Sequence, residues 1–228
     1  MLVIGVLFNL FLVESIIHNM EKQVEKKHYN FHKYCDEERF VSYWHQLKEI
    51  LKVVPHSVLE IGVGDKVLES YIKNNTNIEY VCVDIAGDLS PDVVASVIKL
   101  PFRDDSFDVV CAFEVLEHLP FEKFVIALQE IRRVARKNVI ISLPHWGRHF
   151  SFQIRLPYFK KIIWQYKFNF WPIKHVFKGE HYWEIGKDGY GLKKIKNAII
   201  TAGLEVKEDY VAFNSPYHHF FILKSIQD

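Results

Sequence analysis

Ser57-Val58-Leu59-Glu60-Ile61-Gly62-Val63-Gly64-Asp65 is followed, roughly twenty residues later, by Val81-Cys82-Val83-Asp84. The apolar residues of the first run are typical of a strand that is covered on both faces. The two glycines after it indicate a sharp turn that lets a ligand approach the backbone closely. The second run ends in a carboxylate, which at the end of a neighbouring strand can accept both hydroxyls of a ribose. The pattern therefore indicates a binding site for a nucleoside cofactor.

The segments on either side of this stretch continue an alternation of strands and helices. Apolar runs predict strands at 79–84, 93–98, 107–113, 138–143, 204–213 and 218–224. Helical spacing of apolar residues predicts helices near 40–51, 66–73, 121–136 and 190–201. This order predicts a doubly wound, mostly parallel, seven-stranded Rossmann-like α/β sheet. The link Asn214-Ser215-Pro216 is hairpin-like, so we expect the last strand to be antiparallel.

The chain divides into an N-terminal helical extension, residues 1–56, and an α/β domain, residues 57–228. We expect the helix at 40–51 to lie over the cofactor cleft or against the sheet. Residues 145–180 interrupt the α/β pattern after the fifth strand; they are dense in aromatic and basic residues, and Glu180 is their only acid. This position predicts that the insertion forms a lid over the acceptor site.

Bulk composition excludes some classes of protein and leaves others open. The 228 residues carry a net charge of +1, so no global field attracts nucleic acid. Three cysteines without metal-ligand spacing favour a reducing cytoplasm. Residues 1–17 are mostly apolar but too short for a comfortable membrane span, and they lack the basic start of a signal peptide. They are either a packing or interfacial helix, with peripheral membrane contact as one option, or an extension upstream of a working start at Met20.

The residues around the glycine turn distinguish between nucleoside cofactors. A dinucleotide fingerprint requires a third glycine, but the chain continues as Asp65-Lys66-Val67. Glu60 instead precedes the first glycine by two positions. An adenosine cofactor with a cationic amino-acid tail requires such an acid near the turn, and S-adenosylmethionine has that tail.

Five motifs occur in series between residues 57 and 143. They are Glu60-Ile61-Gly62-Val63-Gly64, Asp84, Leu100-Pro101-Phe102, Ser106-Phe107-Asp108 and Glu114-Val115-Leu116-Glu117-His118-Leu119. In this series the sequence resembles the class I S-adenosylmethionine-dependent methyltransferases. The resemblance implies an enzyme that uses S-adenosylmethionine as its cofactor.

The resemblance also implies which residues bind the cofactor. The methionine portion would contact Glu60, Gly62, Gly64, Phe113 and Glu114, the ribose would contact Asp84, and the adenine would contact Ile85, Ser96 and Val97. Ser96 departs from the family pattern, which commonly has an acid at this position. A neutral hydroxyl accepts a hydrogen bond from the adenine amino group more weakly than a carboxylate does, so we expect either modest cofactor affinity or compensation by Asp92 or Asp104.

Methyl transfer is an in-line displacement, and it needs a general base only when the acceptor must lose a proton, as a hydroxyl does. His118 and His145 are the candidate bases, because each follows a strand at the sheet edge where ligands of open α/β sheets bind. The alternative for His118 is that it only holds its loop. We expect a small-molecule or lipid-like acceptor that is methylated at oxygen.

Other interpretations remain open. Glu114, Glu117, His118 and His181 resemble the metal-binding set of small-RNA 2′-O-methyltransferases and of some ubiquinone-pathway O-methyltransferases. Glu-Val-Leu-Glu-His also occurs in metal-free relatives, so the primary prediction includes no metal. The competing classes are an RNA methyltransferase, including a metal-dependent 2′-O type, and a non-catalytic cofactor-binding partner subunit.

Overall fold

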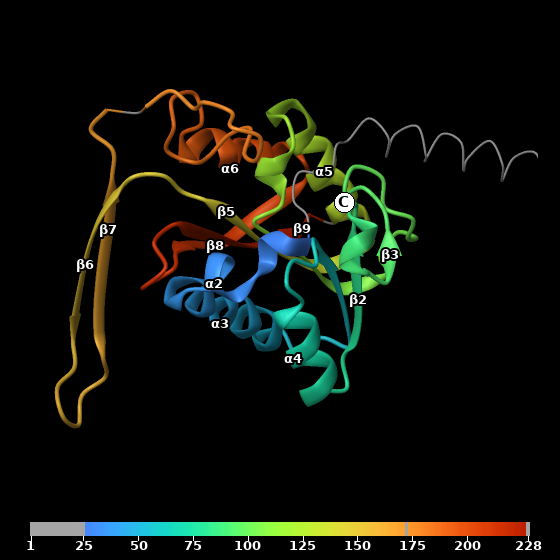
Figure 1. The fold of residues 1–228 in the computed structure, drawn as a ribbon, viewed down its shortest axis with the longest axis horizontal. Helices are drawn as coiled ribbons and strands as arrows, with labels where there is room; N and C mark the ends of the chain where they lie inside the picture. The colour runs from blue at the N-terminus through green and yellow to red at the C-terminus, as the bar shows by residue number, and fades with distance from the viewer. Residues whose placement is uncertain (1–25, 172, 227–228) are drawn as a thin grey trace, which may run out of the picture.

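The computed structural model describes residues 26–171 and 173–226, and a seven-stranded sheet forms its centre (Figure 1). The strand order is β3-β2-β1-β4-β5-β9-β8. The strands are β1 (Ser57–Ile61), β2 (Glu79–Asp84), β3 (Val93–Val94), β4 (Phe107–Phe113), β5 (Ala135–Pro144), β8 (Leu204–Val211) and β9 (His218–Ser225).

Pairing in this sheet confirms the predicted fold class. β1 pairs in parallel with β2 and β4, and β4 pairs in parallel with β5. β9, the last strand, lies between β5 and β8 and runs antiparallel to both. The sheet is therefore mostly parallel with an antiparallel last strand, as the hairpin-like link at 214–216 predicted.

Helices cover both faces of the sheet (Figure 1). α5 (Phe121–Val134) and α6 (Leu192–Thr201) pack on one face, and α3 (Glu37–Lys52) and α4 (Val67–Asn75) pack on the other. Short helices η1 (Lys26–Tyr29) and α2 (Phe31–Tyr34) precede α3, while η2 (Gly87–Leu89) and η3 (Leu116–His118) follow β2 and β4. Because apolar layers lie on both faces, the central strands are continuous apolar runs.

Two strands differ in length from the predicted ones by more than two residues. β3 covers only Val93–Val94 rather than 93–98, because Ser96 pairs with Lys99 in a tight bridge that turns the chain. β5 begins at Ala135 and not at residue 138, because the end of α5 leads directly into extended backbone.

The 145–180 insertion contains regular structure that the sequence analysis did not assign. β6 (Arg148–Ile154) and β7 (Ile162–Phe168) form a separate antiparallel hairpin. The hairpin extends away from the rest of the domain, at the left of Figure 1. The predicted lid role of the whole insertion stays a prediction.

The N-terminal extension is described only from residue 26 onward. The interpretations of residues 1–17, and of Met20 as a start, lie outside the described residues. α3 packs against the sheet, as predicted for one of its two placements, through buried residues that include Tyr43 and Ile50. Among the described residues, no helix combines the length and the apolar character needed to cross a bilayer.

Candidate active site

The turn between β1 and α4 depends on glycine. Gly62 has φ +83°, and its N–H donates to the Val83 carbonyl at 2.8 Å. A Cβ at this position would lie 2.3 Å from Val115 Cγ2. A side chain is therefore excluded both by the backbone conformation and by the close packing of the loop after β4.

Asp84, at the end of β2, fixes the turn from the neighbouring strand. Its Oδ2 accepts from the Val63 N–H at 3.0 Å, and its Oδ1 accepts from the Ala86 N–H at 2.8 Å. Burial raises the pKa of this carboxyl, and the backbone N–H groups oppose that effect. Each carboxylate oxygen can accept a further hydrogen bond, so the group can also bind hydroxyls.

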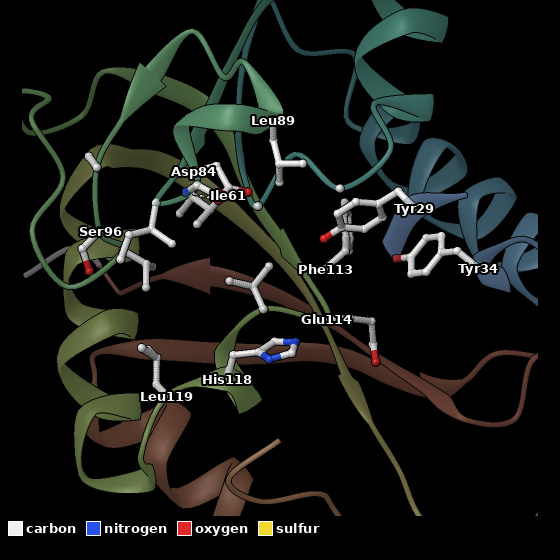
Figure 2. A pocket seen from close by; sticks show the side chains of 17 residues that line it. Tyr29, Tyr34, Ile61, Asp84, Leu89, Ser96, Phe113, Glu114, His118 and Leu119 are labelled. Atoms are coloured by element: carbon white, nitrogen blue, oxygen red, sulfur yellow. Dashed lines mark hydrogen bonds between the residues drawn. The ribbon is translucent and has the colours of Figure 1, made fainter. Parts of the chain in front are cut away.

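A pocket opens at the carboxyl ends of β1, β2 and β4 (Figure 2). Most of the predicted cofactor contacts line it: Gly62, Gly64, Asp84, Ile85, Ser96, Val97, Phe113 and Glu114. His118, one of the two candidate bases, also lines it. The structure thus brings residues from four separate loops to one cavity, and their individual contacts with a cofactor stay predictions.

Glu60 lies outside this lining. Its side chain is buried next to β2, where Cys82 Sγ donates to Glu60 Oε2 at 3.4 Å. Burial raises the pKa of Glu60 to about 8, so the carboxyl is largely protonated near neutral pH in this structure. Its predicted contact with the methionine portion stays a prediction.

Glu114 carries the acidic group at the end of β4. It has φ +54°, an uncommon conformation for a residue other than glycine, and its N–H donates to the Ser142 carbonyl at 3.1 Å. The Ser142 hydroxyl donates to Glu114 Oε1 at 2.8 Å. Burial raises the pKa of Glu114 to about 7. The carboxyl can therefore exchange a proton near neutral pH.

His118 lies in η3, with its Nδ1 3.1 Å from the Glu180 carbonyl oxygen. Its ring meets the His181 ring edge-on, with 4.9 Å between centroids. Burial and the neighbouring His181 lower the pKa of His118 to about 4, so the ring is uncharged at neutral pH. An uncharged imidazole can accept a proton, which is the form that a general base requires.

His145, the second candidate base, is not part of the pocket lining. Its Nδ1 lies 2.8 Å from Nδ1 of His219, and the two rings stack. Burial lowers the pKa of His145 to about 3. His219 Nε2 in turn lies 3.0 Å from Asp209 Oδ2. His145 thus belongs to a series of contacting side chains, His145, His219 and Asp209, near the point where the hairpin leaves the domain. Its catalytic role stays a prediction.

Three of the four residues of the metal alternative lie together. Glu117, His118 and His181 offer ligand atoms that are all within 4.8 Å of one another. Glu117 is fully buried, and neither of its carboxylate oxygens has a hydrogen-bond partner among the described residues. His181 Nδ1 lies 3.1 Å from Glu184 Oε1, a contact that orients the ring. A buried carboxylate without a hydrogen-bond partner in the described part of the chain, close to two imidazoles, fits a divalent ion. Glu114 is not part of this group.

The aromatic wall of the pocket was not predicted from the sequence. Tyr29 and Tyr34, from η1 and α2, line it on the side of Glu114 and Phe113 (Figure 2). Arg39 lies over the Tyr34 ring at 4.5 Å from its centroid. Aromatic residues in an otherwise polar stretch, 21–39, were the available signal, but no sequence spacing connects that stretch to the glycine turn.

Comparison with known families identifies the domain that carries this pocket. Residues 59–143 match a family model described as "Methyltransferase domain" (Methyltransf_11). The matched segment runs from β1 to β5 and includes the glycine turn, Asp84 and the loop with Glu114 and His118. No curated protein matches the sequence.

Several solved structures are similar in fold at low sequence identity. A 1,6-didemethyltoxoflavin N1-methyltransferase from Burkholderia thailandensis, with bound 1,6-didemethyltoxoflavin and S-adenosylhomocysteine, is 13% identical with a TM-score of 0.52, covering 83% of this chain and 86% of that one. The magnesium protoporphyrin IX methyltransferase of Synechocystis, with bound S-adenosylmethionine, is 12% identical with a TM-score of 0.52, covering 82% and 79%. A Haloferax volcanii protein in complex with the Trm112 methyltransferase activator is 12% identical with a TM-score of 0.55, covering 87% and 96%.

At these identities the structural similarity shows the fold alone, and the family match supplies the chemistry. That match covers every residue that lines the pocket except Tyr29 and Tyr34. The family match over residues 59–143 and the fold together support a class I S-adenosylmethionine-dependent methyltransferase.

Proposed function

We propose that the enzyme methylates an oxygen atom of a small-molecule or lipid-like acceptor. The observation that carries the proposal is the grouping of two proton-accepting side chains, Glu114 and His118, on one side of the pocket. In Figure 2 they lie opposite Asp84 and Leu89 across the cavity. A hydroxyl acceptor needs such a group, because its proton must leave as the new bond to carbon forms.

The pocket residues would have separate roles in binding the cofactor, excluding water and accepting the proton. Bound S-adenosylmethionine supplies an electrophilic methyl group on a sulfonium. Asp84 would hold the ribose, and Tyr29 and Tyr34 would exclude water from the side of Glu114. Glu114 or His118 would accept the acceptor's hydroxyl proton. Transfer would form the oxygen–carbon bond as the sulfur–carbon bond breaks, and would leave a methylated acceptor and S-adenosylhomocysteine.

A divalent ion is the second element of the proposal, on the evidence of the orphaned Glu117 carboxylate. Glu117, His118 and His181 would hold the ion beside the pocket, since His118 belongs both to this group and to the pocket lining. With His118 on the ion, Glu114 would be the group that accepts the hydroxyl proton. Such an ion would bind an acceptor hydroxyl and lower its pKa. EDTA should then abolish turnover and Mg²⁺ or Mn²⁺ should restore it. Turnover that is unchanged in EDTA would contradict the proposed ion, but it would not contradict the proposed methyl transfer.

Metal binding has a readout that does not depend on turnover. Calorimetry with Mn²⁺ should give binding in the wild-type enzyme and a loss of at least about tenfold in affinity in Glu117→Gln. Asp92→Asn is the matched control, because Asp92 belongs to a second group with Glu69 and Cys82 that Lys73 already neutralises.

Lipid-like acceptors are favoured over RNA by the exposed apolar hairpin, whose side chains include Phe150, Phe152 and Ile162. A labelled-methyl screen tests this choice: cell extract is incubated with enzyme and labelled S-adenosylmethionine, then separated into lipid, RNA and small-molecule fractions. We expect label in the lipid or small-molecule fraction. If the label is confined to RNA, and the enzyme binds RNA with an affinity that falls steeply with salt, the acceptor is RNA and not a small or lipid-like molecule.

A further inference from the structure

The β6–β7 hairpin has one apolar face. Cross-strand neighbours Phe150 and Tyr166, and Phe152 and Trp164, point to the same side, followed toward the tip by the pair Ile154 and Ile162. Phe150, Phe152, Trp164, Tyr166 and Ile162 are 57%, 48%, 53%, 57% and 56% exposed. In a soluble antiparallel sheet the apolar face normally packs on a core, so a contiguous face of this kind in water marks an interaction site.

The opposite face of the hairpin is the one that meets the domain. Gln165 Nε2 donates to the Val211 carbonyl at 3.5 Å. Lys167 Nζ donates to the carbonyls of His145 and Pro216. Because side chains alternate along a strand, these contacts turn the even-numbered, apolar residues of β7 away from the body. The hairpin thus directs its polar side inward and its apolar side outward, which is the reverse of a core-forming strand pair.

The tip of the hairpin combines apolar side chains with cations. Leu156, Tyr158 and Phe159 are 52%, 105% and 72% exposed. Arg155 and Lys160 flank them, and no acid occurs between residues 148 and 179. Long basic side chains beside exposed aromatic and aliphatic groups suit the boundary between lipid headgroups and acyl chains, where each part of the side chain finds its preferred surroundings.

We propose that the β6–β7 hairpin docks the enzyme onto an anionic lipid surface. The tip residues Leu156, Tyr158 and Phe159 enter the headgroup region, and the outer face of the hairpin lies against it. Arg155 and Lys160 contact anionic headgroups, each contributing about fivefold to binding. This docking goes beyond the proposed methyl transfer, and it does not depend on which atom is methylated.

Charge and side-chain chemistry disfavour two other occupants. A second copy of the chain would bring two acid-free, cationic tips together, and like charges in contact oppose association. RNA would satisfy the cations and could stack on the aromatic rings. It would leave the aliphatic groups of Ile154, Leu156 and Ile162 without apolar partners, whereas a bilayer buries them.

The test is co-sedimentation of the full chain with vesicles, without any methyl acceptor. Vesicles of phosphatidylcholine mixed with phosphatidylglycerol should bind the protein, and those of phosphatidylcholine alone should bind it at least about tenfold more weakly. Tyr158→Ser/Phe159→Ser and Arg155→Glu/Lys160→Glu should each weaken binding to the mixed vesicles by at least about tenfold. Brominated lipid chains should quench the fluorescence of Trp164 in the bound protein.

Matched controls carry comparable changes outside the hairpin. Tyr71→Ser, on α4, removes a half-exposed aromatic ring, and Lys193→Glu, on α6, reverses an exposed charge. Both should bind vesicles like the wild type. Calorimetry with S-adenosylmethionine should give wild-type affinity for every tip variant, so a failure of docking is distinguishable from a failure of the active site.

Three results would overturn the proposal. The first is no binding to the mixed vesicles, and the second is binding that the tip variants leave unchanged. The third is a dimer that persists in lipid-free buffer and is lost in the tip variants, because it would assign the apolar face to a second copy of the chain.

Discussion

β4 and the β6–β7 hairpin contain similar residues in opposite environments. Six of the seven residues of β4, all except Asp108, are apolar, and the strand is covered by helices on both faces. Eight of the fourteen residues of β6 and β7 are aromatic or aliphatic, yet most side chains of the two strands are exposed. Apolar content alone therefore does not place a strand in a core. β4 is covered by apolar side chains of the helices, and the hairpin has no such layer. An apolar strand pair that is left uncovered is available for contact with a partner.

The largest test of this comparison removes one isoleucine from each region. Ile141, on β5, is fully buried, and Ile162, on β7, is 56% exposed. Ile141→Ala should lower the free energy of unfolding by about 2–5 kcal/mol, because it leaves a cavity in the core. Ile162→Ala should change it by less than about 0.5 kcal/mol. Urea denaturation measures both, and equal losses would mean that the hairpin is packed in solution.

The glycine turn provides the next largest effect. Gly62→Ala should destabilise the protein by about 2–4 kcal/mol, because it adds a Cβ at positive φ against Val115. Gly87→Ala is the control, since Gly87 has no positive φ and its added Cβ would meet Val94 at an ordinary 3.6 Å. Thermal unfolding of the two variants should separate them clearly; a Gly62→Ala protein as stable as Gly87→Ala would show that the turn tolerates a side chain.

Asp84→Ala tests the cofactor pocket, which lies in the buried α/β sheet and not in the hairpin. The change leaves the Val63 and Ala86 N–H groups without their acceptor and removes the proposed ribose ligand. We expect S-adenosylmethionine affinity to fall by about ten- to a hundredfold, measured by calorimetry. Asp88→Asn, two residues beyond the turn contacts, should retain affinity. Full affinity in Asp84→Ala would remove this residue from the site.

The smallest expected effect is a pH dependence at the root of the hairpin. The hydrogen bond with His219, and the ion pair with Lys196, lower the pKa of Asp209 to about 2. Burial lowers the pKa of His219, and Lys196 Nζ lies 2.6 Å from Asp209 Oδ1 as the ion-pair partner. The folded state keeps Asp209 ionised below the pH, near 4, at which the unfolded chain protonates it. Its contribution is therefore complete above pH 4 and is lost as pH falls from 4 to 2.

Asp209→Asn isolates that contribution. The variant should be about 1–2 kcal/mol less stable than the wild type at pH 6, and the difference should shrink toward pH 2. Denaturant unfolding across this range gives the comparison. A difference that stays constant with pH would mean that Asp209 acts through packing and not through its charge.

Sequence alone predicted the regions whose burial produces a simple pattern. β1, β2 and β4 were recognisable because strands covered on both faces are uninterrupted apolar runs, and the motifs along them placed Asp84 and Glu114 at one edge. The hairpin was not predicted because the apolar–polar alternation at Phe150 and Phe152 is short. The aromatic and basic residues around it have no fixed period, so they hide the strand pattern.

Contacts between distant parts of the chain could not be read from local patterns. Tyr29 lines the pocket because the N-terminal segment that carries it runs past the cavity. His145 contacts His219 because β9 pairs with β5. His145 follows a strand, as His118 does, but only His118 lines the pocket. Position at a strand end indicates the correct edge of the sheet, and the paths of the loops decide which side chains enter the cavity.

The place of β9 in the sheet has a consequence for protein synthesis. β9 is synthesised after both β5 and β8, yet it lies between them in the sheet and brings His218 Nε2 to 3.8 Å from Glu114 Oε2. A nascent chain that ends before His218 has an unpaired β5 edge and an active site open on its Glu114 side. During synthesis, the Glu114 side of the pocket is therefore completed only after β9 has emerged and paired with β5.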